Sequence, residues 1–322
     1  MKVARSLSPR EVAIEEVDEP EPGPGDVVCR MVACGVCKSD VTDWYVERKV
    51  PTVLGHELVG EVEAVGLGVT TVAPGDVVAV HHHTPCGECR RCRRGHETLC
   101  ERFRSTGLDP GGFAEKVRVP SDLVDELMPL DGLDPVTATW IEPLACVLRS
   151  QDRAGLRGGD ALLVVGAGAN GLLQIASAHT RAVDVVFVRE PRRERLELAE
   201  GLGAEEHGNE QVDVAVVCTP APDAIAAAAD ALAPGGVLCL YAPPDPGAPL
   251  PVDGAELFLR ELEIRASYSA GHDDMTRAFE LLRSGKIDPR PLTTDRLPLQ
   301  EAQRALELTR SGRTLKAVLV AS

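Results

Sequence analysis

Aromatic residues are scarce in this sequence, at 3% of its 322 residues. Basic residues are also in deficit: 34 Lys and Arg face 50 Asp and Glu, for a net charge of −16 at pH 7. Such a chain is repelled by phosphate backbones and anionic lipids, so the charge disfavours a nucleic-acid or membrane-surface partner. No stretch approaches the roughly eighteen consecutive apolar residues that a membrane-spanning helix needs.

No export signal is expected, because Met1–Ser6 lacks the apolar core of a signal peptide. The ten cysteines are therefore expected to be thiols and metal ligands rather than disulfides. We expect a cytoplasmic protein.

Two kinds of hydrophobic pattern divide the chain, and its length suits two domains. The first third has short Val-rich runs bounded by Gly and Pro, which predict the strands of a barrel-like β domain. A helix is predicted from Asp134-Pro135 to about Arg149, with Asp as N-cap and Pro at N1. From Ala161, fully apolar strands alternate with helices, which indicates a parallel sheet covered on both faces. The closing strand, 316–320, is expected to return to the first domain.

Four cysteines lie close together in the sequence, with the spacing Cys86-x2-Cys89-x2-Cys92-x7-Cys100. Four thiolates can bind one Zn²⁺ tetrahedrally, and such a closed site is structural because no position is open for substrate. A redox-active Cys-x-x-Cys is the alternative. The overlapping pairs and the fourth cysteine favour metal.

A second candidate metal site needs about three protein ligands and one open position. Cys37 supplies a thiolate and His56 an imidazole, and either Glu57 or Glu142 could complete the set. A His-Glu pair after a strand is more often a pair of ordinary polar residues at the surface or in the core. Together with the cysteine quartet, however, it favours a catalytic zinc site.

A glycine-rich turn, Gly166-x-Gly168-x-x-Gly171, lies between a predicted strand and a predicted helix. In this context the first glycine makes the tight turn, the second admits a pyrophosphate and the third allows close helix packing. The alternative is a turn without a ligand.

Glu190, at the end of the next predicted strand, could accept hydrogen bonds from a ribose 2′-hydroxyl, which favours NAD. Arg189, Arg192 and Arg193 lie beside it and could favour NADP instead.

Two other groups of residues are assigned no chemistry. Consecutive residues of a strand point to opposite faces, so His81, His82 and His83 are predicted to be packing or loop residues. The remaining cysteines are predicted to be small buried hydrophobic residues: Cys29, Cys34, Cys146, Cys218 and Cys239.

These motifs, with Gly111-Gly112-Phe113-Ala114-Glu115, resemble the zinc-dependent medium-chain dehydrogenases in order and spacing over nearly the whole chain. The resemblance implies an α/β protein of two domains: a GroES-like β-barrel catalytic domain (1–146 and 271–322) and a Rossmann domain with a doubly wound parallel sheet (147–270). It also implies two zinc ions per chain, one catalytic and one structural.

The stretch Ile141-Glu142-Pro143-Leu144 resembles the polyol, or sorbitol-type, branch of that family. The branch implies Cys37 and His56 as zinc ligands, with Glu57 and Glu142 exchanging the third role. Lys38 and Lys316 resemble positions that place a cation near the cofactor pyrophosphate; a solvated lysine is the alternative. Ser39 is expected to take the proton of the substrate hydroxyl. Relatives often end the proton relay with His where this chain has Thr42, so Ser39 must pass the proton to the ribose hydroxyls, to water or to another group.

We therefore expect an enzyme that transfers hydride between NAD and a secondary alcohol of a polyol, cyclitol, aminocyclitol or sugar-like substrate. Its partners would be this small hydroxylated molecule and other copies of the chain, as a homodimer or homotetramer. One alternative is an NADP-dependent reductase of small alcohols or aldehydes. Another is a non-catalytic nucleotide-binding protein with one structural zinc.

Overall fold

The computed structural model describes residues 1–321, and the chain folds into two compact units. Unit 1 is Met1–Pro143 with Gly271–Ser322, and unit 2 is Leu144–Ala270. The boundary predicted after residue 146 lies slightly further along helix α4 (Ile141–Ala154), whose first residues belong to unit 1.

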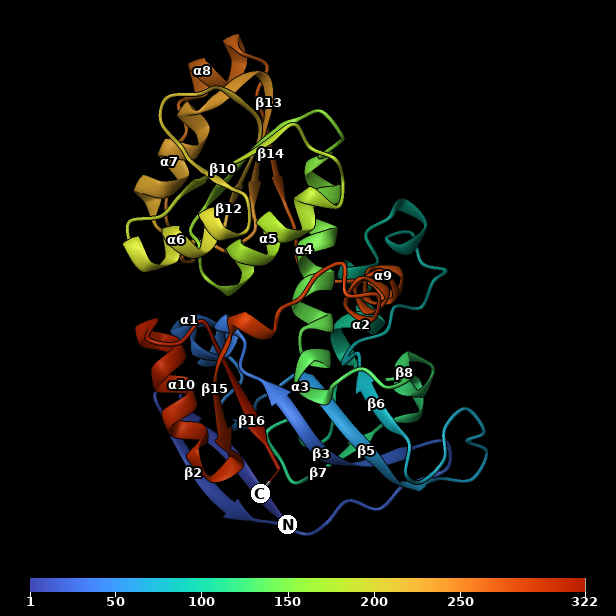
Figure 1. Cartoon of the computed structure of the whole chain (residues 1–322). Helices are drawn as coiled ribbons and strands as arrows, with labels where there is room; N and C mark the ends of the chain where they lie inside the picture. The colour runs from blue at the N-terminus through green and yellow to red at the C-terminus, as the bar shows by residue number, and fades with distance from the viewer. Residues whose placement is uncertain (322) are drawn as a thin grey trace. The chain divides into compact units, whose positions relative to one another are not determined.

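Unit 1 contains two sheets with short helices between the strands (Figure 1). The strand orders are β2-β1-β4 and β15-β16-β3-β5-β6-β8, and β7 also pairs with β3. The strands are β1 (Lys2–Ser8), β2 (Glu11–Glu16), β3 (Val27–Gly35), β4 (Thr52–Val53), β5 (Glu57–Val65), β6 (Val77–Val80), β7 (Lys116–Val119), β8 (Leu127–Pro129), β15 (Thr293–Pro298) and β16 (Lys316–Val320). The Val-rich runs of the sequence supply β3, β5, β6 and β7, whose buried side chains form the core of this unit.

The helices of unit 1 are mostly single turns. They are α1 (Asp43–Val46), α2 (Glu101–Ser105), α3 (Pro135–Ala138), α9 (His272–Arg283) and α10 (Ala302–Ser311), with the 3₁₀ helices η1 (Lys38–Val41), η2 (Cys92–Arg94), η3 (Glu97–Leu99), η4 (Ser121–Glu126), η5 (Arg290–Leu292) and η6 (Leu299–Glu301). The last strand, β16, is antiparallel to β3, so the end of the chain returns to unit 1 as predicted (Figure 1).

Unit 2 is a six-stranded parallel sheet in the order β11-β10-β9-β12-β13-β14. Its strands are β9 (Ala161–Val165), β10 (Val185–Arg189), β11 (Glu205–Glu206), β12 (Val212–Val217), β13 (Leu232–Leu240) and β14 (Glu263–Ala266). Its helices, besides α4, are α5 (Ala169–His179), α6 (Arg193–Gly201), α7 (Pro222–Asp230) and α8 (Gly254–Leu259). The strand order runs outward in both directions from β9, as in a doubly wound sheet. The two-domain fold class is therefore confirmed.

The helix predicted from Asp134 to Arg149 is wrong as one element. Asp134 caps α3 as expected, with its carboxylate accepting the Thr137 N–H at 2.8 Å. The helix ends at Ala138, and a turn precedes α4. In the turn, Trp140 is fully buried and its indole N–H donates to the Thr293 hydroxyl at 2.8 Å. Anchoring this large side chain in unit 1 interrupts the helix.

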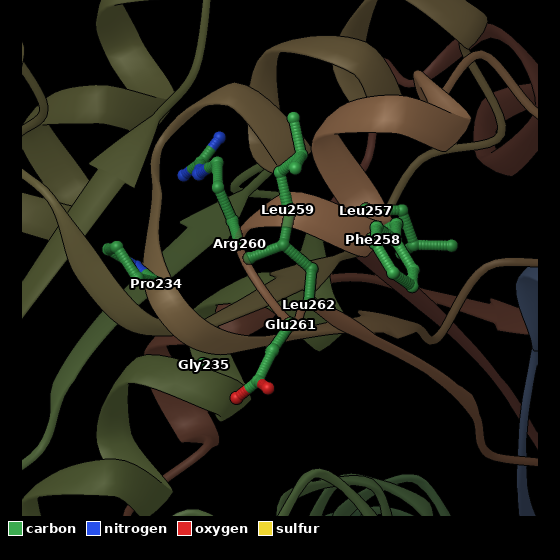
Figure 2. Close-up of a pocket in the computed structure, with 8 residues that line it drawn as sticks. All are labelled: Pro234, Gly235, Leu257, Phe258, Leu259, Arg260, Glu261 and Leu262. Atoms are coloured by element: carbon green, nitrogen blue, oxygen red, sulfur yellow. The ribbon is translucent and has the colours of Figure 1, made fainter.

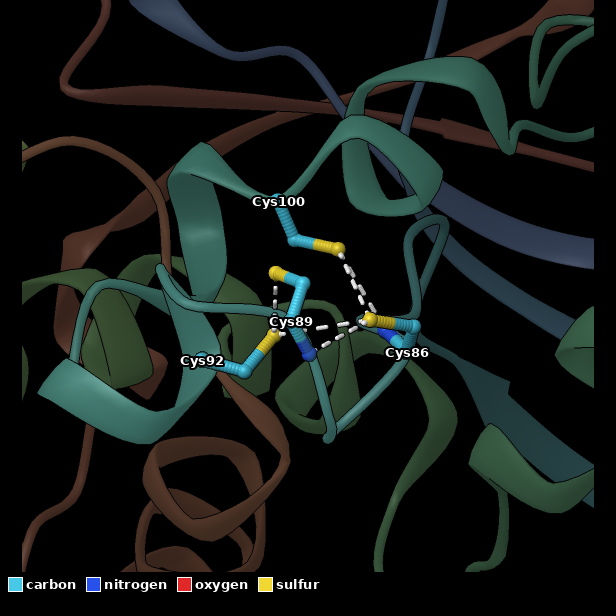
Figure 3. Close-up of side chains that lie close together, drawn as sticks. All are labelled: Cys86, Cys89, Cys92 and Cys100. Atoms are coloured by element: carbon cyan, nitrogen blue, oxygen red, sulfur yellow. Dashed lines mark hydrogen bonds between the residues drawn. The ribbon is translucent and has the colours of Figure 1, made fainter.

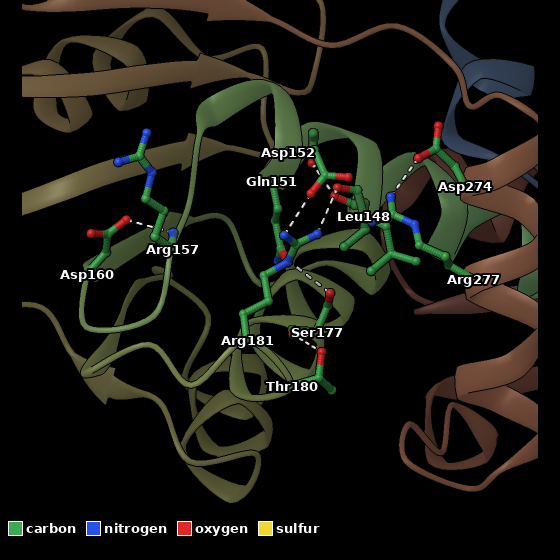
Figure 4. Close-up of polar contacts among 12 residues, drawn as sticks. Leu148, Gln151, Asp152, Arg157, Asp160, Ser177, Thr180, Arg181, Asp274 and Arg277 are labelled. Carbon is green, nitrogen blue, oxygen red and sulfur yellow. Dashed lines mark hydrogen bonds and ion pairs between the residues drawn. The ribbon is translucent and has the colours of Figure 1, made fainter.

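Helices α4 and α5 of unit 2 are joined by a buried polar network as well as by apolar packing. Gln151 donates from Nε2 to the Gln174 carbonyl at 2.9 Å, and Gln174 donates to the Ser150 hydroxyl at 2.6 Å. Arg181, just after α5, pairs with Asp152 at 2.7 Å and donates to the Leu148 carbonyl (Figure 4). Because buried polar groups must be hydrogen-bonded, the network fixes the relative position of the two helices.

Within residues 1–321, none of the helices is both long enough and apolar enough to cross a membrane.

Candidate active site and metal centres

The pairing of β3 with β5 brings Cys37 and His56 together. Gly35, the last residue of β3, lies opposite Glu57, the first residue of β5. Cys37 follows the end of β3 and His56 precedes the start of β5, so both lie at the same end of this antiparallel pair. One ligand atom from each of Cys37, His56 and Glu57 lies within 4.8 Å of the others. This set of thiolate, imidazole and carboxylate donors suits Zn²⁺.

Glu57 fits into this corner because residue 35 is glycine. A Cβ at position 35 would lie 1.9 Å from the Glu57 carboxylate. On the same side, Lys316 at the start of β16 forms a buried ion pair with Glu57. The Lys316 ammonium also lies 5.2 Å from the centre of the Trp140 ring.

Burial and the opposite charge of the partner shift the pKa values of both Glu57 and Lys316. Burial raises the pKa of Glu57, although the Lys316 charge opposes the shift. Burial lowers the pKa of Lys316, but the neighbouring Glu57 and Cys37 outweigh it and the net shift is upward. In this structure the Lys316 ammonium is directed to Glu57, and its contact with a cofactor pyrophosphate stays a prediction.

Asp40 orients the first two candidate ligands, and sequence reasoning gave it no role. Its buried carboxylate accepts the backbone N–H of Cys37 at 3.0 Å and lies 3.6 Å from Nδ1 of His56. Burial lowers the pKa of His56, but Asp40 and Cys37 outweigh it and raise that pKa well above its usual value. A carboxylate behind a ligating histidine fixes the ring orientation, leaving Nε2 for a metal. Its position three residues after Cys37, in a one-turn helix, was the available signal.

Glu142, in the first turn of α4, is also directed to this corner. It is buried, and its charge raises the pKa values of His56, Glu57 and Lys316. Both carboxylates considered for the third ligand position therefore lie near His56.

The other predicted residues of this segment lie on η1. Ser39 is half-buried, two residues after Cys37. The Lys38 ammonium donates to the carbonyls of Thr309 and Arg310 at 3.3 and 3.5 Å, at the C-terminal end of α10. Lys38 thus caps a helix end, where cations are favourable, and its cofactor contact stays a prediction. The Thr42 hydroxyl donates to the Lys38 carbonyl at 3.0 Å.

The three histidines after β6 are loop residues, as predicted, but the reason given for that prediction does not hold. The strand ends at Val80, so the alternation of strand faces does not apply to them, and that argument was wrong. The rings of His82 and His83 lie 4.0 Å apart, and His82 lies 4.9 Å from the His56 ring, centre to centre. Burial and the neighbouring imidazoles hold the pKa of His82 well below its usual value and lower that of His83 to about 3.

Like His83, His81 packs against Phe103. It is fully buried, and its Nδ1 lies 3.6 Å from the carboxylate of Glu126. That carboxylate also accepts hydrogen bonds from Thr84 at 2.8 Å and pairs with His272 at 2.9 Å. Burial would raise the pKa of Glu126, but His81, His272 and Thr84 lower it to about 2.

The cysteine quartet has the dimensions of a tetrahedral metal site (Figure 3). The Sγ–Sγ distances are 3.5 Å for Cys89–Cys92, 3.6 Å for Cys86–Cys100 and 3.9 Å for Cys86–Cys92. Zn–S bonds of about 2.3 Å in a tetrahedron place sulfurs about 3.8 Å apart, whereas a disulfide needs about 2.05 Å. All ten cysteines are free thiols in this structure. The distances fit one closed Zn²⁺ site.

Backbone amides stabilise thiolates in the quartet. The Cys86 N–H donates to the Cys100 sulfur at 3.4 Å, and the Cys89 N–H donates to the Cys86 sulfur at 3.3 Å. Burial opposes ionisation of Cys100, but the backbone N–H groups of Cys86, Phe103 and Arg102 and the Cys86 side chain lower the pKa of Cys100 to about 6.

The glycine turn of unit 2 has the backbone that a dinucleotide cradle requires. Gly166 has φ +96°, which favours glycine, and a Cβ at Gly171 would lie 1.9 Å from the Gly166 carbonyl oxygen. Gly168 is the N-cap of α5, and a Cβ there would meet only the Arg195 guanidinium, at 3.9 Å. The first and third glycines thus serve the turn itself, and the second leaves open space at a helix N-terminus suited to phosphate.

We expect Gly171→Ala to destabilise the protein by about 3 kcal/mol or more, because the added methyl overlaps a backbone oxygen that cannot move aside. Gly168→Ala is the matched control: it should keep the melting temperature and weaken NADH binding at least tenfold. Thermal melting and titration of NADH fluorescence measure the two effects. Equal melting temperatures for both variants would contradict this account of the turn.

Glu190 lies beside this turn. Its carboxylate accepts the Ala167 N–H at 2.7 Å and the Arg192 N–H at 3.0 Å. Arg189 is directed to the ring of His207, with a distance of 2.9 Å to Nδ1. Arg195, which sequence reasoning missed, is the cation next to Gly168. Its position on the first turn of α6 after Glu190 was the only signal for it.

Comparisons with known proteins show the family to which the chain belongs. The model of the alcohol dehydrogenase GroES-like domain matches residues 23–130, and that of zinc-binding dehydrogenases matches residues 182–319. L-threonine 3-dehydrogenase of Pyrococcus abyssi is 33% identical over 95% of this chain and 94% of its own length. Sorbitol dehydrogenase of Bacillus subtilis is 30% identical over 95% and 93%.

A solved structure from Sinorhizobium meliloti 1021, described as that of a zinc-binding dehydrogenase bound to NADP, has a TM-score of 0.88 at 26% identity. The match covers 99% of this chain and 98% of that one.

Proposed function

Because the chain belongs to the zinc-dependent medium-chain branch of the alcohol dehydrogenase superfamily, we propose that it oxidises a secondary alcohol of a hydroxylated substrate with NAD. The family makes it an enzyme, a zinc-dependent and NAD(P)-linked dehydrogenase. The observation that carries the proposal is the cluster of Cys37, His56 and Glu57, whose donor atoms lie within 4.8 Å of one another.

Cys37 and His56 would hold the catalytic zinc, with Glu57 or Glu142 as the third ligand. A zinc ion bound there supplies Lewis acidity, which stabilises negative charge on an alcohol oxygen. Asp40 holds the His56 ring for this role, and Lys316 balances the buried charge of Glu57. Cys86, Cys89, Cys92 and Cys100 would hold the structural zinc.

Ser39 is our candidate for accepting the proton of the substrate hydroxyl. It is half-buried on η1 next to the cluster. The Thr42 hydroxyl donates to a backbone carbonyl, so it is already engaged at the place where relatives often have His. We propose that the proton leaves Ser39 through water or the ribose hydroxyls.

For the cofactor we propose NAD, held at Gly166, Gly168, Gly171 and Glu190. The Glu190 carboxylate is fixed by two backbone amides at the turn, where its charge would repel a 2′-phosphate. Arg189 is engaged by His207, which disfavours its use as a 2′-phosphate clamp. The NADP bound to the relative from S. meliloti keeps the NADP-dependent reductase as the second candidate.

We expect Glu190→Ser to lower the ratio of kcat/KM with NAD to kcat/KM with NADP by about a hundredfold. The reason is that the change removes one charge and one ribose partner, each worth about one power of ten. Initial rates with both cofactors measure the ratio. Glu194→Ala, an exposed acid on α6, should leave it unchanged. A wild-type preference for NADP would overturn the assignment of NAD.

The substrate class is proposed from the relatives. Sorbitol dehydrogenase and L-threonine 3-dehydrogenase are both named for hydroxylated substrates. We propose a polyol, cyclitol, aminocyclitol or sugar-like alcohol, and a cytoplasmic enzyme with free thiols. A screen of these alcohols with NAD, followed as NADH absorbance, tests this class. Turnover of only simple aldehydes with NADPH would favour the second candidate.

We also propose that two copies pair along β14, the edge strand of the unit 2 sheet. Phe258 and Leu259 are 80% and 73% exposed, beside a hollow lined by Pro234 and Gly235 (Figure 2). Antiparallel pairing of two β14 strands about Ile264 would place Glu263 of each copy opposite Arg265 of the other. An unpaired edge and a self-complementary charge pattern both favour a second copy as the partner.

We expect Arg265→Glu to weaken the dimer at least tenfold, because like charges would then face each other across the strands. The exchange Glu263→Arg with Arg265→Glu should restore dimerisation. Light scattering after size-exclusion chromatography measures the mass. A wild-type monomer at micromolar concentration would contradict the proposed pairing.

A further inference from the structure

His82 is a polar side chain at the candidate zinc site that the chemistry above leaves unused. Its ring lies 4.9 Å from the ring of His56, at a tilt of 46°. The other side of His82 packs on His83, with the ring centres 4.0 Å apart. The two neighbouring imidazoles therefore fix the plane in which its nitrogens lie.

The two nitrogens of His82 have different surroundings. The Nδ1 atom of His82 is buried and has no hydrogen-bond partner in residues 1–321. His82 as a whole is only half-buried, and no hydrogen bond joins its Nε2 to the part of the chain that the structure describes. Nε2 is thus the nitrogen left to meet solvent or a ligand.

The tautomer follows from this difference. Above neutral pH an imidazole carries one N–H and one lone pair. An enclosed N–H without an acceptor is rarer in proteins, and costlier, than an enclosed acceptor without a donor. The proton therefore belongs on Nε2, which makes His82 a neutral donor whose ring lies 4.9 Å from that of His56, a candidate zinc ligand.

We propose that His82 determines specificity by donating a hydrogen bond from Nε2 to a neutral oxygen on the carbon next to the one that is oxidised. The enzyme would then take vicinal diols in preference to isolated alcohols and to vicinal amino alcohols, whose ammonium group cannot accept a hydrogen bond. This inference rests on the proposed function and names the substrate class of the same site.

The experiment compares kcat/KM for propane-1,2-diol, propan-2-ol and 1-aminopropan-2-ol, with NAD and the holoenzyme. The wild type should prefer the diol over both others. In His82→Phe, which keeps a ring against His56 and His83, the diol to mono-alcohol ratio should fall about ten- to a hundredfold. The loss should appear mainly in KM, because the contact is made in the bound substrate as well as in the transition state.

Two further variants keep the result interpretable. His82→Asn, which retains an N–H donor, should recover part of the preference, and His272→Phe, on α9 beside Glu126, should leave the ratio at the wild-type value. An unchanged ratio in His82→Phe, or a wild type that turns over the alcohols without preferring the diol, would overturn the role of His82. A holoenzyme that oxidises none of these alcohols would instead count against the proposed function.

Discussion

Replacing Cys37 by Ser should remove one of two zinc ions per chain and lower kcat/KM by about a thousandfold or more. The hydroxyl of serine is a much weaker zinc ligand than a thiolate, and the remaining donors no longer form a complete set. A bound metal contributes several kcal/mol to stabilising charge on oxygen, and each 1.36 kcal/mol corresponds to a factor of ten in rate.

Metal analysis of the purified variant, together with NADH formation, measures both effects. Cys239→Ala is the matched control: it removes a buried thiol of β13 in unit 2 and should leave two zinc ions and normal turnover. The melting temperature of Cys37→Ser should fall only slightly, because Cys37 is half-buried and the quartet is intact. Normal turnover of the variant after loss of a zinc ion would exclude metal-assisted chemistry at this site.

The sequence predicted best what a short segment determines by itself. The apolar runs at 161–165 and 185–188 predict buried strands of a sheet that is covered on both faces, and the structure has β9 and β10 there. The glycines at 166 and 171 need no distant partner, because the overlap that excludes a side chain at 171 comes from residue 166 itself. The quartet likewise follows from spacing alone.

What the sequence could not predict depends on pairs far apart in the chain. Lys316 and Glu57 are 259 residues apart, and their ion pair exists because β16 and β5 both flank β3. Gly35 makes the space for this pair, but in the sequence it is one glycine among 30. The contact of His82 with His56 could not be predicted either, because it depends on β6 ending at Val80. The break at Trp140 also depends on a distant residue, Thr293.

Removing one quartet cysteine should have the largest effect on stability. We expect Cys89→Ser to lose one zinc ion and to lower the melting temperature by about 10 °C or more. Structural zinc contributes folding energy directly, on the order of 10 kcal/mol in zinc-finger peptides. If the variant loses about half of that folding free energy, the usual shift of about 2–4 °C per kcal/mol lowers the melting temperature by about 10 °C or more.

The segment from Cys86 to Cys100 has little else to hold it together. Its regular structure is two 3₁₀ helices of three residues each, η2 and η3. Between the cysteines the side chains are mostly exposed, including four arginines: Arg90, Arg91, Arg93 and Arg94. A loop with no apolar core keeps its shape only through a cross-link, and we propose that zinc bound by the four thiolates provides it.

Those four arginines make the prediction directly measurable, because trypsin cleaves after arginine in mobile loops. The wild-type protein should resist cleavage there, whereas Cys89→Ser should be cut first between residues 90 and 95, as identified by mass spectrometry. Cys37→Ser is the matched control, since it also loses one zinc ion but keeps the quartet and should resist trypsin. If Cys89→Ser were as resistant as the wild type, the quartet would not be a structural cross-link, and the redox alternative would be tested next by counting its thiols.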